Sequence, residues 1–154
     1  MYGNTYTQIH IHFVFAVKFR QAIINKNWKE DLYKYIAGII KNNNHKLLAI
    51  NGFSDHIHIL IGIRPAQSIS DLMKIIKQDS SKWINANKFS KFHFEWQEGY
   101  GAFSYSKSQL ATVVNYIQNQ ELQHKKKTFR EEYIDFLEKF DVDYDEKFIF
   151  KELI

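Results

Sequence analysis

The stretch Asp55-His56-Ile57-His58-Ile59-Leu60-Ile61-Gly62-Ile63 decides the fold of this chain. Isoleucine occupies every odd position from 57 to 63, and histidine occupies positions 56 and 58. Successive side chains of a β-strand point to opposite faces, so this alternation predicts a half-buried strand whose isoleucines face a core. The two histidines then project together from the other face, with Cα atoms about 6.6 Å apart. Two imidazoles held this way on a rigid strand can converge on one metal ion.

The composition is that of one globular domain. The chain has 154 residues, of which 45% are hydrophobic and 25% charged. No apolar run approaches the length of a membrane span, no secretory signal is recognisable, and the absence of cysteine excludes disulfides and thiolate metal sites. We therefore expect a cytoplasmic protein. The net charge of +4 favours a polyanionic partner without establishing one.

Hydrophobic periodicity and capping signals predict the remaining elements. The expected strands cover residues 6–18, 46–53 and 56–63, with one or two short strands in 92–104. The expected helices cover about 27–43, 69–87, 106–124 and 128–140. Ser68 is the expected N-cap of the second helix, and Ser106 with Gln109 and Thr128 with Glu131 form expected capping boxes of the last two.

The resulting order is β-α-β-β-α-β followed by helices. This order predicts an α+β fold with a ferredoxin-like, RRM-like antiparallel sheet that carries helices on one face. We expect the other face to be open, with His10, His12, His56 and His58 projecting onto it or beside it. The prediction is one domain over residues 1–154, in which the tail of about 141–154 has no assigned role.

The third predicted helix places a tyrosine where packing does not require one. Its apolar face is made by Leu110, Val113, Val114 and Ile117. Tyr116 lies on a polar flank, one turn before Gln120. A surface tyrosine is the ordinary explanation. The alternative is a nucleophile whose neighbour Gln120 shares a metal with two histidines.

The histidine motif is weak evidence when it is taken alone. Roughly 0.3 His-x-His triplets are expected by chance in such a chain, and a second one, His10-Ile11-His12, is present. Either pair alone is more often structural than metal-binding.

Taken together, the motifs resemble a known family. Asp55-His56-Ile57-His58-Ile59-Leu60 and Asn115-Tyr116-Ile117-Gln118-Asn119-Gln120 are similar to the His-hydrophobic-His and Tyr-x-x-x-Gln motifs of the single-tyrosine HUH transposases of insertion-sequence-200/605-like elements. Further matches are His12-Phe13-Val14-Phe15, Lys18-Phe19-Arg20, Trp96-Gln97-Glu98-Gly99-Tyr100 and Thr128-Phe129-Arg130-Glu131-Glu132. The similarity covers about residues 4–140.

The resemblance implies a metal-dependent transposase that cuts and rejoins single-stranded DNA with hairpin ends. Tyr116 would form a 5′-phosphotyrosine, and His56, His58 and Gln120 would bind Mg²⁺ or Mn²⁺. It also implies a homodimer in which the tyrosine helix of one subunit completes the site of the other. His10-Ile11-His12 would then be a bystander on the sheet.

Weaker candidates surround this set. Lys18, Arg20, Lys74 and Lys77 are candidate contacts to the DNA backbone, although solvated surface charge explains each of them equally well. Asp55 is a candidate to orient a ligand imidazole, although an aspartate in a hairpin is also explained by the turn.

Other functional classes stay open on the sequence alone. A sheet with exposed aromatic side chains can bind single-stranded nucleic acid without cutting it. A plasmid relaxase or rolling-circle initiator shares the HUH motif, but we expect such proteins to be longer. A domesticated relative that processes repeat hairpins would use the same chemistry.

Overall fold

One antiparallel sheet of four strands forms the middle layer of the protein. The computed structural model describes residues 4–124, 126–151 and 153. Its strands are β1 (His10–Ala16), β2 (Lys46–Phe53), β3 (His56–Gly62) and β4 (Gly101–Tyr105). Its helices are α1 (Lys29–Asn42), α2 (Ile69–Ala86), α3 (Leu110–Gln118), α4 (Gln120–Gln123) and α5 (Phe129–Lys139). Short 3-10 turns, η1 (Arg20–Ala22) and η2 (Lys107–Gln109), precede α1 and α3.

The sheet has the predicted ferredoxin-like topology. Its strand order is β2-β3-β1-β4, and every neighbouring pair is antiparallel. β1 and β3 are therefore the two central strands. Ala16 pairs with His56 and Val14 with His58, so the two histidines lie on a central strand, at its end beside the β2–β3 turn that the sequence predicted at Ser54-Asp55.

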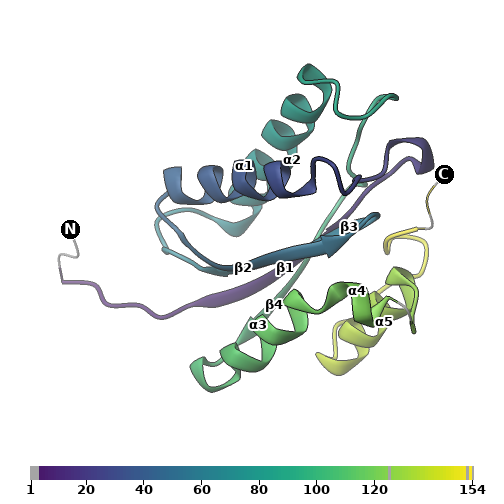
Figure 1. Cartoon of the computed structure of the whole chain (residues 1–154). Helices are drawn as coiled ribbons and strands as arrows, with labels where there is room; N and C mark the ends of the chain where they lie inside the picture. The colour runs from purple at the N-terminus through teal and green to yellow at the C-terminus, as the bar shows by residue number, and fades with distance from the viewer. Residues whose placement is uncertain (1–3, 125, 152, 154) are drawn as a thin grey trace.

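Helices cover both faces of this sheet, and the expectation of an open face is wrong. Figure 1 shows α1 and α2 on one side of the strands and α3, α4 and α5 on the other. The helices after β4 fold back onto the face that carries the histidines, because their own apolar and aromatic side chains need burial. The histidines consequently project into the protein interior.

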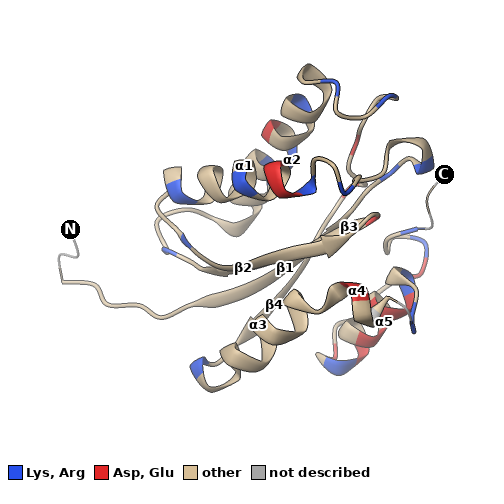
Figure 2. Ribbon diagram, viewed as in Figure 1, with Lys and Arg blue, Asp and Glu red and all other residues tan. Residues whose placement is uncertain are grey.

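The central strands are buried on both faces. All residues of β3 from His56 to Ile61 are buried, including those on the histidine face. β3 is thus not the half-buried strand that its alternation suggested. β1 and β3 contain no Lys, Arg, Asp or Glu, and the charged residues lie mainly on helices and loops (Figure 2). This distribution follows from the cost of burying an unpaired charge.

Most predicted helix boundaries agree with the structure. Ser68 caps α2 by accepting a hydrogen bond from the Asp71 amide, and both predicted capping boxes form. The third predicted helix is not continuous, however. It breaks at Asn119, whose φ of −102° and ψ of 29° leave the helical range, and α3 and α4 are separate elements. Among the described residues, no helix is both long enough and apolar enough to cross a membrane.

The strands differ from the prediction at their ends. The first strand begins at His10, because residues 5–9 run along the surface without a partner strand. The segment predicted as one or two strands over residues 92–104 contains β4 and an isolated bridge between Trp96 and Val17.

The C-terminal segment, which had no predicted role, packs against the domain. Ile149 and Phe150 are buried, at 8% and 4% exposed. Gln97 makes two hydrogen bonds with the Lys151 backbone, and Arg130 donates to the Phe150 carbonyl. Residues 149–151 are therefore part of the folded domain.

This packing makes a prediction for two phenylalanines that lie two positions apart. Replacing Phe150 by alanine should lower the free energy of unfolding by about 3–5 kcal/mol, because a buried aromatic ring is lost. The matched change at Phe148, which is 86% exposed, should cost less than about 0.5 kcal/mol. Urea denaturation of both variants measures the difference. Equal effects would show that the C-terminal segment does not pack as described.

Candidate active site

The two histidines of β3 present one ring nitrogen each to a common point. Their side chains are fully buried. His56 Nδ1 lies 2.7 Å from Asp55 Oδ1, and His58 Nδ1 lies 2.7 Å from His12 Nε2. With both Nδ1 atoms occupied, the Nε2 atoms face the interior space beneath α4 and α5. Asp55 is thus in the position expected of a residue that orients a ligand imidazole.

The single-turn helix α4 contributes Gln120 to the same space, and His124, the residue that follows α4, lies there too. Gln120 is fully buried, and its Oε1 lies 2.9 Å from His56 Nε2. His124, one turn later, places its Nε2 3.1 Å from the same Gln120 oxygen. The structure therefore brings together His56, His58 and Gln120 within a single chain.

A buried carboxylate from α5 completes the cluster. Glu132 is 5% exposed, and its Oε1 lies 3.0 Å from His58 Nε2 and 3.5 Å from His56 Nε2. Ligand atoms of His56, His58 and Glu132 all lie within 4.8 Å of one another. The sequence reasoning did not find Glu132. The feature of the sequence that could have indicated it is a carboxylate in the apolar stripe that also contains Phe129, Tyr133 and Phe136.

Tyr116 faces this cluster and not the solvent. Its hydroxyl donates a hydrogen bond to Glu132 Oε2. Its ring is half-buried, with its centroid 5.9 Å from that of His58 and 5.7 Å from that of Phe136. The polar flank of the helix is therefore the flank that points at the histidines.

The protonation states at the site follow from burial and from Glu132. Burial alone would raise the pKa of Glu132, but hydrogen bonds from His124 and His58 hold the pKa well below the ordinary carboxyl value. Burial, with the charge and hydrogen bond of Glu132, raises the pKa of Tyr116 far above that of a free tyrosine. Burial lowers the pKa of His58 to about 4 although Glu132 opposes it. At neutral pH, Glu132 is ionised, His58 is neutral and Tyr116 keeps its proton.

Three further pKa shifts extend this pattern to the neighbours of the ligand set. Burial lowers the pKa of His12 well below its ordinary value, and the charge of His58 lowers it further. Burial would lower the pKa of His124, but the hydrogen bond and charge of Glu132, with the charge of Asp55, together outweigh burial and raise the pKa. Burial would raise the pKa of Asp55, but the hydrogen bond with His56 and the charges of His56 and His124 together outweigh burial and lower the pKa.

The donor set fits a divalent cation. It offers two imidazole nitrogens, one amide oxygen and one carboxylate oxygen, a mixture that suits Mn²⁺ and that Mg²⁺ tolerates less readily. Each histidine is held through its Nδ1 by another side chain, which is the usual arrangement around a metal-binding imidazole. The carboxylate also supplies the negative charge that a cation requires.

The interpretation of His10-Ile11-His12 as a bystander is wrong for His12. His12 is fully buried and contacts His58 directly. His10 is half-buried at the far end of β1, where it pairs with Gly62 and Tyr105. The sequence could not separate the two, because both alternate correctly along the strand.

The four predicted DNA-contacting cations do not gather at this cluster. Lys18 forms an ion pair with Glu95 at 3.8 Å, and Arg20 donates to the Leu153 carbonyl at 3.3 Å. Lys77 donates to the backbone carbonyls of Gln97 and Gly99. Lys74 is exposed on α2, on the sheet face opposite the histidines.

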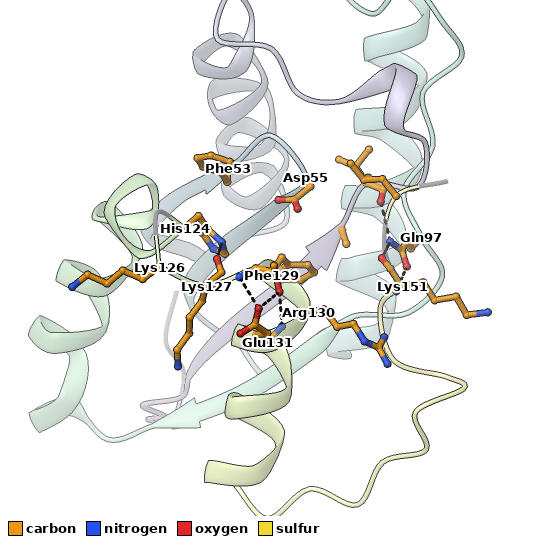
Figure 3. Close-up of a pocket in the computed structure, with 14 residues that line it drawn as sticks. Phe53, Asp55, Gln97, His124, Lys126, Lys127, Phe129, Arg130, Glu131 and Lys151 are labelled. Atoms are coloured by element: carbon orange, nitrogen blue, oxygen red, sulfur yellow. Dashed lines mark hydrogen bonds between the residues drawn. The ribbon is translucent and has the colours of Figure 1, made fainter.

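A different basic surface borders the site. A pocket of about 360 Å³ opens beside Asp55 and His124. Figure 3 shows the side chains that line it. Its basic members are Lys126, Lys127, Arg130 and Lys151. Phe53, 39% exposed, forms part of its wall. The pocket therefore combines cations and an aromatic ring next to the candidate ligands.

Sequence comparison identifies relatives of this chain. The family described as "Transposase IS200 like" matches residues 5–120. The ISDra2 transposase TnpA of Deinococcus radiodurans is 22% identical over 118 residues, which cover 73% of this chain and 84% of that protein. The transposase for insertion sequence element IS200 of Salmonella typhimurium is 27% identical over 115 residues, covering 71% and 74%. Tyr116 and Gln120 lie inside the family match, whereas His124 and Glu132 lie beyond it.

Solved structures share the fold. A transposase chain from Deinococcus radiodurans superposes with a TM-score of 0.61 at 24% identity, covering 76% of this chain and 94% of that chain. A REP-associated tyrosine transposase bound to a REP hairpin gives a TM-score of 0.59 at 15% identity, covering 80% and 73%. At these identities the likeness extends to the fold.

The buried neutral histidines predict a dependence of stability on pH. The unfolded chain binds protons on His12 and His58 near pH 6.5, but the folded chain does not, so stability falls as the pH decreases. His58, with its pKa of about 4, and His12 should together lower the free energy of unfolding by about 2–5 kcal/mol between pH 7 and pH 4.5. Urea denaturation in a chelator measures this. A flat profile over that range would contradict the protonation states assigned here.

In that window His124 contributes little, because its raised pKa leaves it protonated in both states below pH 6. The lowered pKa values of Glu132 and Asp55 add a further loss only below about pH 4.5. The two effects are therefore separated by pH.

Proposed function

This chain belongs to the IS200-like transposase family, and we propose that it cuts and rejoins single-stranded DNA at insertion-sequence ends with Tyr116 as nucleophile. One observation carries the proposal. The Tyr116 hydroxyl, the Nε2 atoms of His56 and His58 and the Gln120 amide nitrogen converge on the Glu132 carboxylate in one buried cluster. A domain that only binds nucleic acid has no need to bury such a set.

In the proposed reaction, Tyr116 Oη attacks a phosphodiester and displaces the 3′-oxygen. The enzyme then carries a 5′-phosphotyrosine, and the DNA ends in a free 3′-hydroxyl. A different 3′-hydroxyl later attacks the phosphotyrosine and restores both the phosphodiester and the tyrosine. The ester bond conserves the energy between the two steps, so ATP is not required.

The side chains around Tyr116 manage its proton. Glu132 Oε2 accepts the hydrogen bond from the phenol and is positioned to take the proton when the phosphorus–oxygen bond forms. The same carboxylate can return that proton to the leaving 3′-oxygen, which balances the step. Without substrate, burial and the charge of Glu132 keep Tyr116 in its unreactive protonated form.

His56, His58, Gln120 and Glu132 are the proposed ligands of Mg²⁺ or Mn²⁺. When bound, the cation would withdraw charge from the scissile phosphate and offset the negative charge beside Tyr116. Asp55 would orient the His56 ring through the hydrogen bond at Nδ1. Glu132 Oε1 faces the two histidines while Oε2 faces the tyrosine, so one carboxylate links the two parts of the site.

The basic pocket beside the site offers a path for the DNA strand. Lys126 and Arg130 are placed to contact phosphates, and Phe53 is placed to stack on a base. Of the four cations predicted to contact DNA, Arg20 contacts Leu153 and Lys77 contacts Gln97, and both of these partners line the pocket. Lys74 is exposed on α2, on the other face of the sheet.

The nucleophile assignment predicts the behaviour of two tyrosine variants. With single-stranded insertion-sequence DNA and Mn²⁺, Tyr116→Phe should form no covalent adduct detectable by denaturing gel electrophoresis. Tyr105→Phe is the matched control, since Tyr105 is a half-buried tyrosine near His12, and it should react like the unmodified protein. An adduct in Tyr116→Phe would exclude Tyr116 as nucleophile. DNA binding without any adduct in the unmodified protein would favour the binding-only alternative.

We also propose the homodimer with shared sites that the family resemblance implies, in which the tyrosine helix of each subunit would leave the cluster of its own chain and complete the site of the other, and a mixing experiment tests it. Tyr116→Phe and His56→Ala should each be inactive. If the tyrosine of one subunit serves the histidines of the other, a mixed dimer has one intact site of two. Half of the dimers are mixed, so mixing should restore up to about a quarter of the cleavage activity. No recovery, in a mixture shown to exchange subunits, would mean that each site is built within one chain.

A further inference from the structure

We propose that His12 is a positioning residue that fixes His58 in the ring tautomer able to bind the metal. The inference rests on the metal site of the proposed function and adds a residue to it. His12 belongs to the second His-x-His triplet, on a different strand from His56 and His58.

The contact between His12 and His58 is isolated from solvent. Both side chains are fully buried, and His12 Nε2 lies 2.7 Å from His58 Nδ1. The other His12 nitrogen, Nδ1, has no hydrogen-bond partner among the described residues. The rings of Phe103, Tyr105 and Phe136 surround His12. His58 is therefore the polar group that determines where the His12 proton resides.

Without a metal, the protons on these two rings follow from Glu132. His58 Nε2 lies 3.0 Å from the Glu132 carboxylate, which accepts and cannot donate, so the neutral His58 carries its proton on Nε2. His58 Nδ1 is then an acceptor, and His12 donates to it from Nε2. This assignment leaves His12 Nδ1 as a lone pair, which agrees with its lack of a partner.

Metal binding requires the opposite arrangement. A metal at His58 Nε2 needs the lone pair there, so a neutral His58 must carry its proton on Nδ1. His12 Nε2 must then accept, and the His12 proton must reside on Nδ1. The proton between the two rings moves from His12 Nε2 to His58 Nδ1. When the metal binds, His58 loses the proton on Nε2, and His12 gains a proton at Nδ1. The number of protons on the pair stays the same.

His12 can make this change because nothing else holds it. If a backbone carbonyl accepted from Nδ1, or an amide donated to it, one tautomer would be fixed. The arrangement differs from that of His56, whose Nδ1 faces the Asp55 carboxylate. A carboxylate accepts only, so Asp55 favours a proton on His56 Nδ1 and leaves Nε2, the atom nearest Gln120 Oε1, as the nitrogen for a metal. Of the two ligand histidines, only His58 depends on a neutral partner that must change tautomer.

Direct measurement of Mn²⁺ affinity tests the proposal in the full-length protein, independently of cleavage. His12→Phe keeps a ring but removes the acceptor, and it should weaken Mn²⁺ binding about 10–100-fold in an electron paramagnetic resonance titration. His12→Gln places an amide oxygen near the Nε2 position and should restore the affinity to within about threefold of the unmodified protein. His10→Phe, the matched change at the other histidine of the triplet, should leave the affinity unchanged.

A second measurement does not depend on how the variants fold. Nitrogen NMR of the unmodified protein should show the His58 proton on Nε2 without metal and on Nδ1 with Zn²⁺ as a diamagnetic probe. Unchanged Mn²⁺ affinity in His12→Phe, equal losses in His12→Phe and His12→Gln, or a His58 Nδ1 without a proton in the Zn²⁺ form would each overturn the proposal. If the unmodified protein binds Mn²⁺ and His56→Ala does not, such a failure concerns His12 alone. If the unmodified protein binds no Mn²⁺, both the metal site and the role of His12 are refuted.

Discussion

The structure on the histidine face depends on one buried carboxylate. A buried charge is tolerated only when partners compensate for its lost hydration, and Glu132, on α5, finds them on three other elements. His58 comes from β3, Tyr116 from α3 and Gln120 from α4, and His124 directly follows α4. The need to satisfy this carboxylate explains why the C-terminal helices must close over the sheet in one arrangement.

The central strand β3 separates two interior regions of different polarity, one on each face of the sheet. Its isoleucines face the apolar core beneath α1 and α2, while its histidines face a polar cluster enclosed by aromatic rings. His56 stacks on Phe129 with ring centroids 4.1 Å apart, and Phe136 lies against His12, His58 and Tyr116. The aromatic enclosure excludes water, which strengthens each hydrogen bond in the cluster and makes a missing partner costly. Rigidity at the site therefore arises from its apolar surroundings as much as from its polar contacts.

The sequence was sufficient for the features that depend on local pattern. The alternation of isoleucine and histidine predicted β3 and the shared face of His56 and His58. The order of the elements predicted the sheet topology. The helical spacing of Tyr116 and Gln120 predicted that both lie on one flank of their helix. The sequence was insufficient for residues whose role depends on contacts with segments that are distant in the chain. Glu132 follows Glu131, which belongs to a capping box, and acidic residues are common in the first turn of a helix. The sequence therefore did not distinguish Glu132 from an ordinary acidic residue of that turn, although Glu132 lies in the apolar stripe. His12 differs from His10 only in what lies opposite each of them, which no local pattern records.

The break at Asn119 has a mechanical consequence. In an unbroken helix, two side chains four residues apart move as one rigid body. Here α3 packs on β2 and β3, whereas the turn that carries Gln120 is held by His56 and by a separate contact of α4 with β2. Tyr116 and Gln120 thus lie on separate elements, and the contact that they share is Glu132. In the proposed reaction, a Tyr116 joined to a DNA strand would therefore be able to move with α3, while Gln120 kept its position against His56 and the sheet.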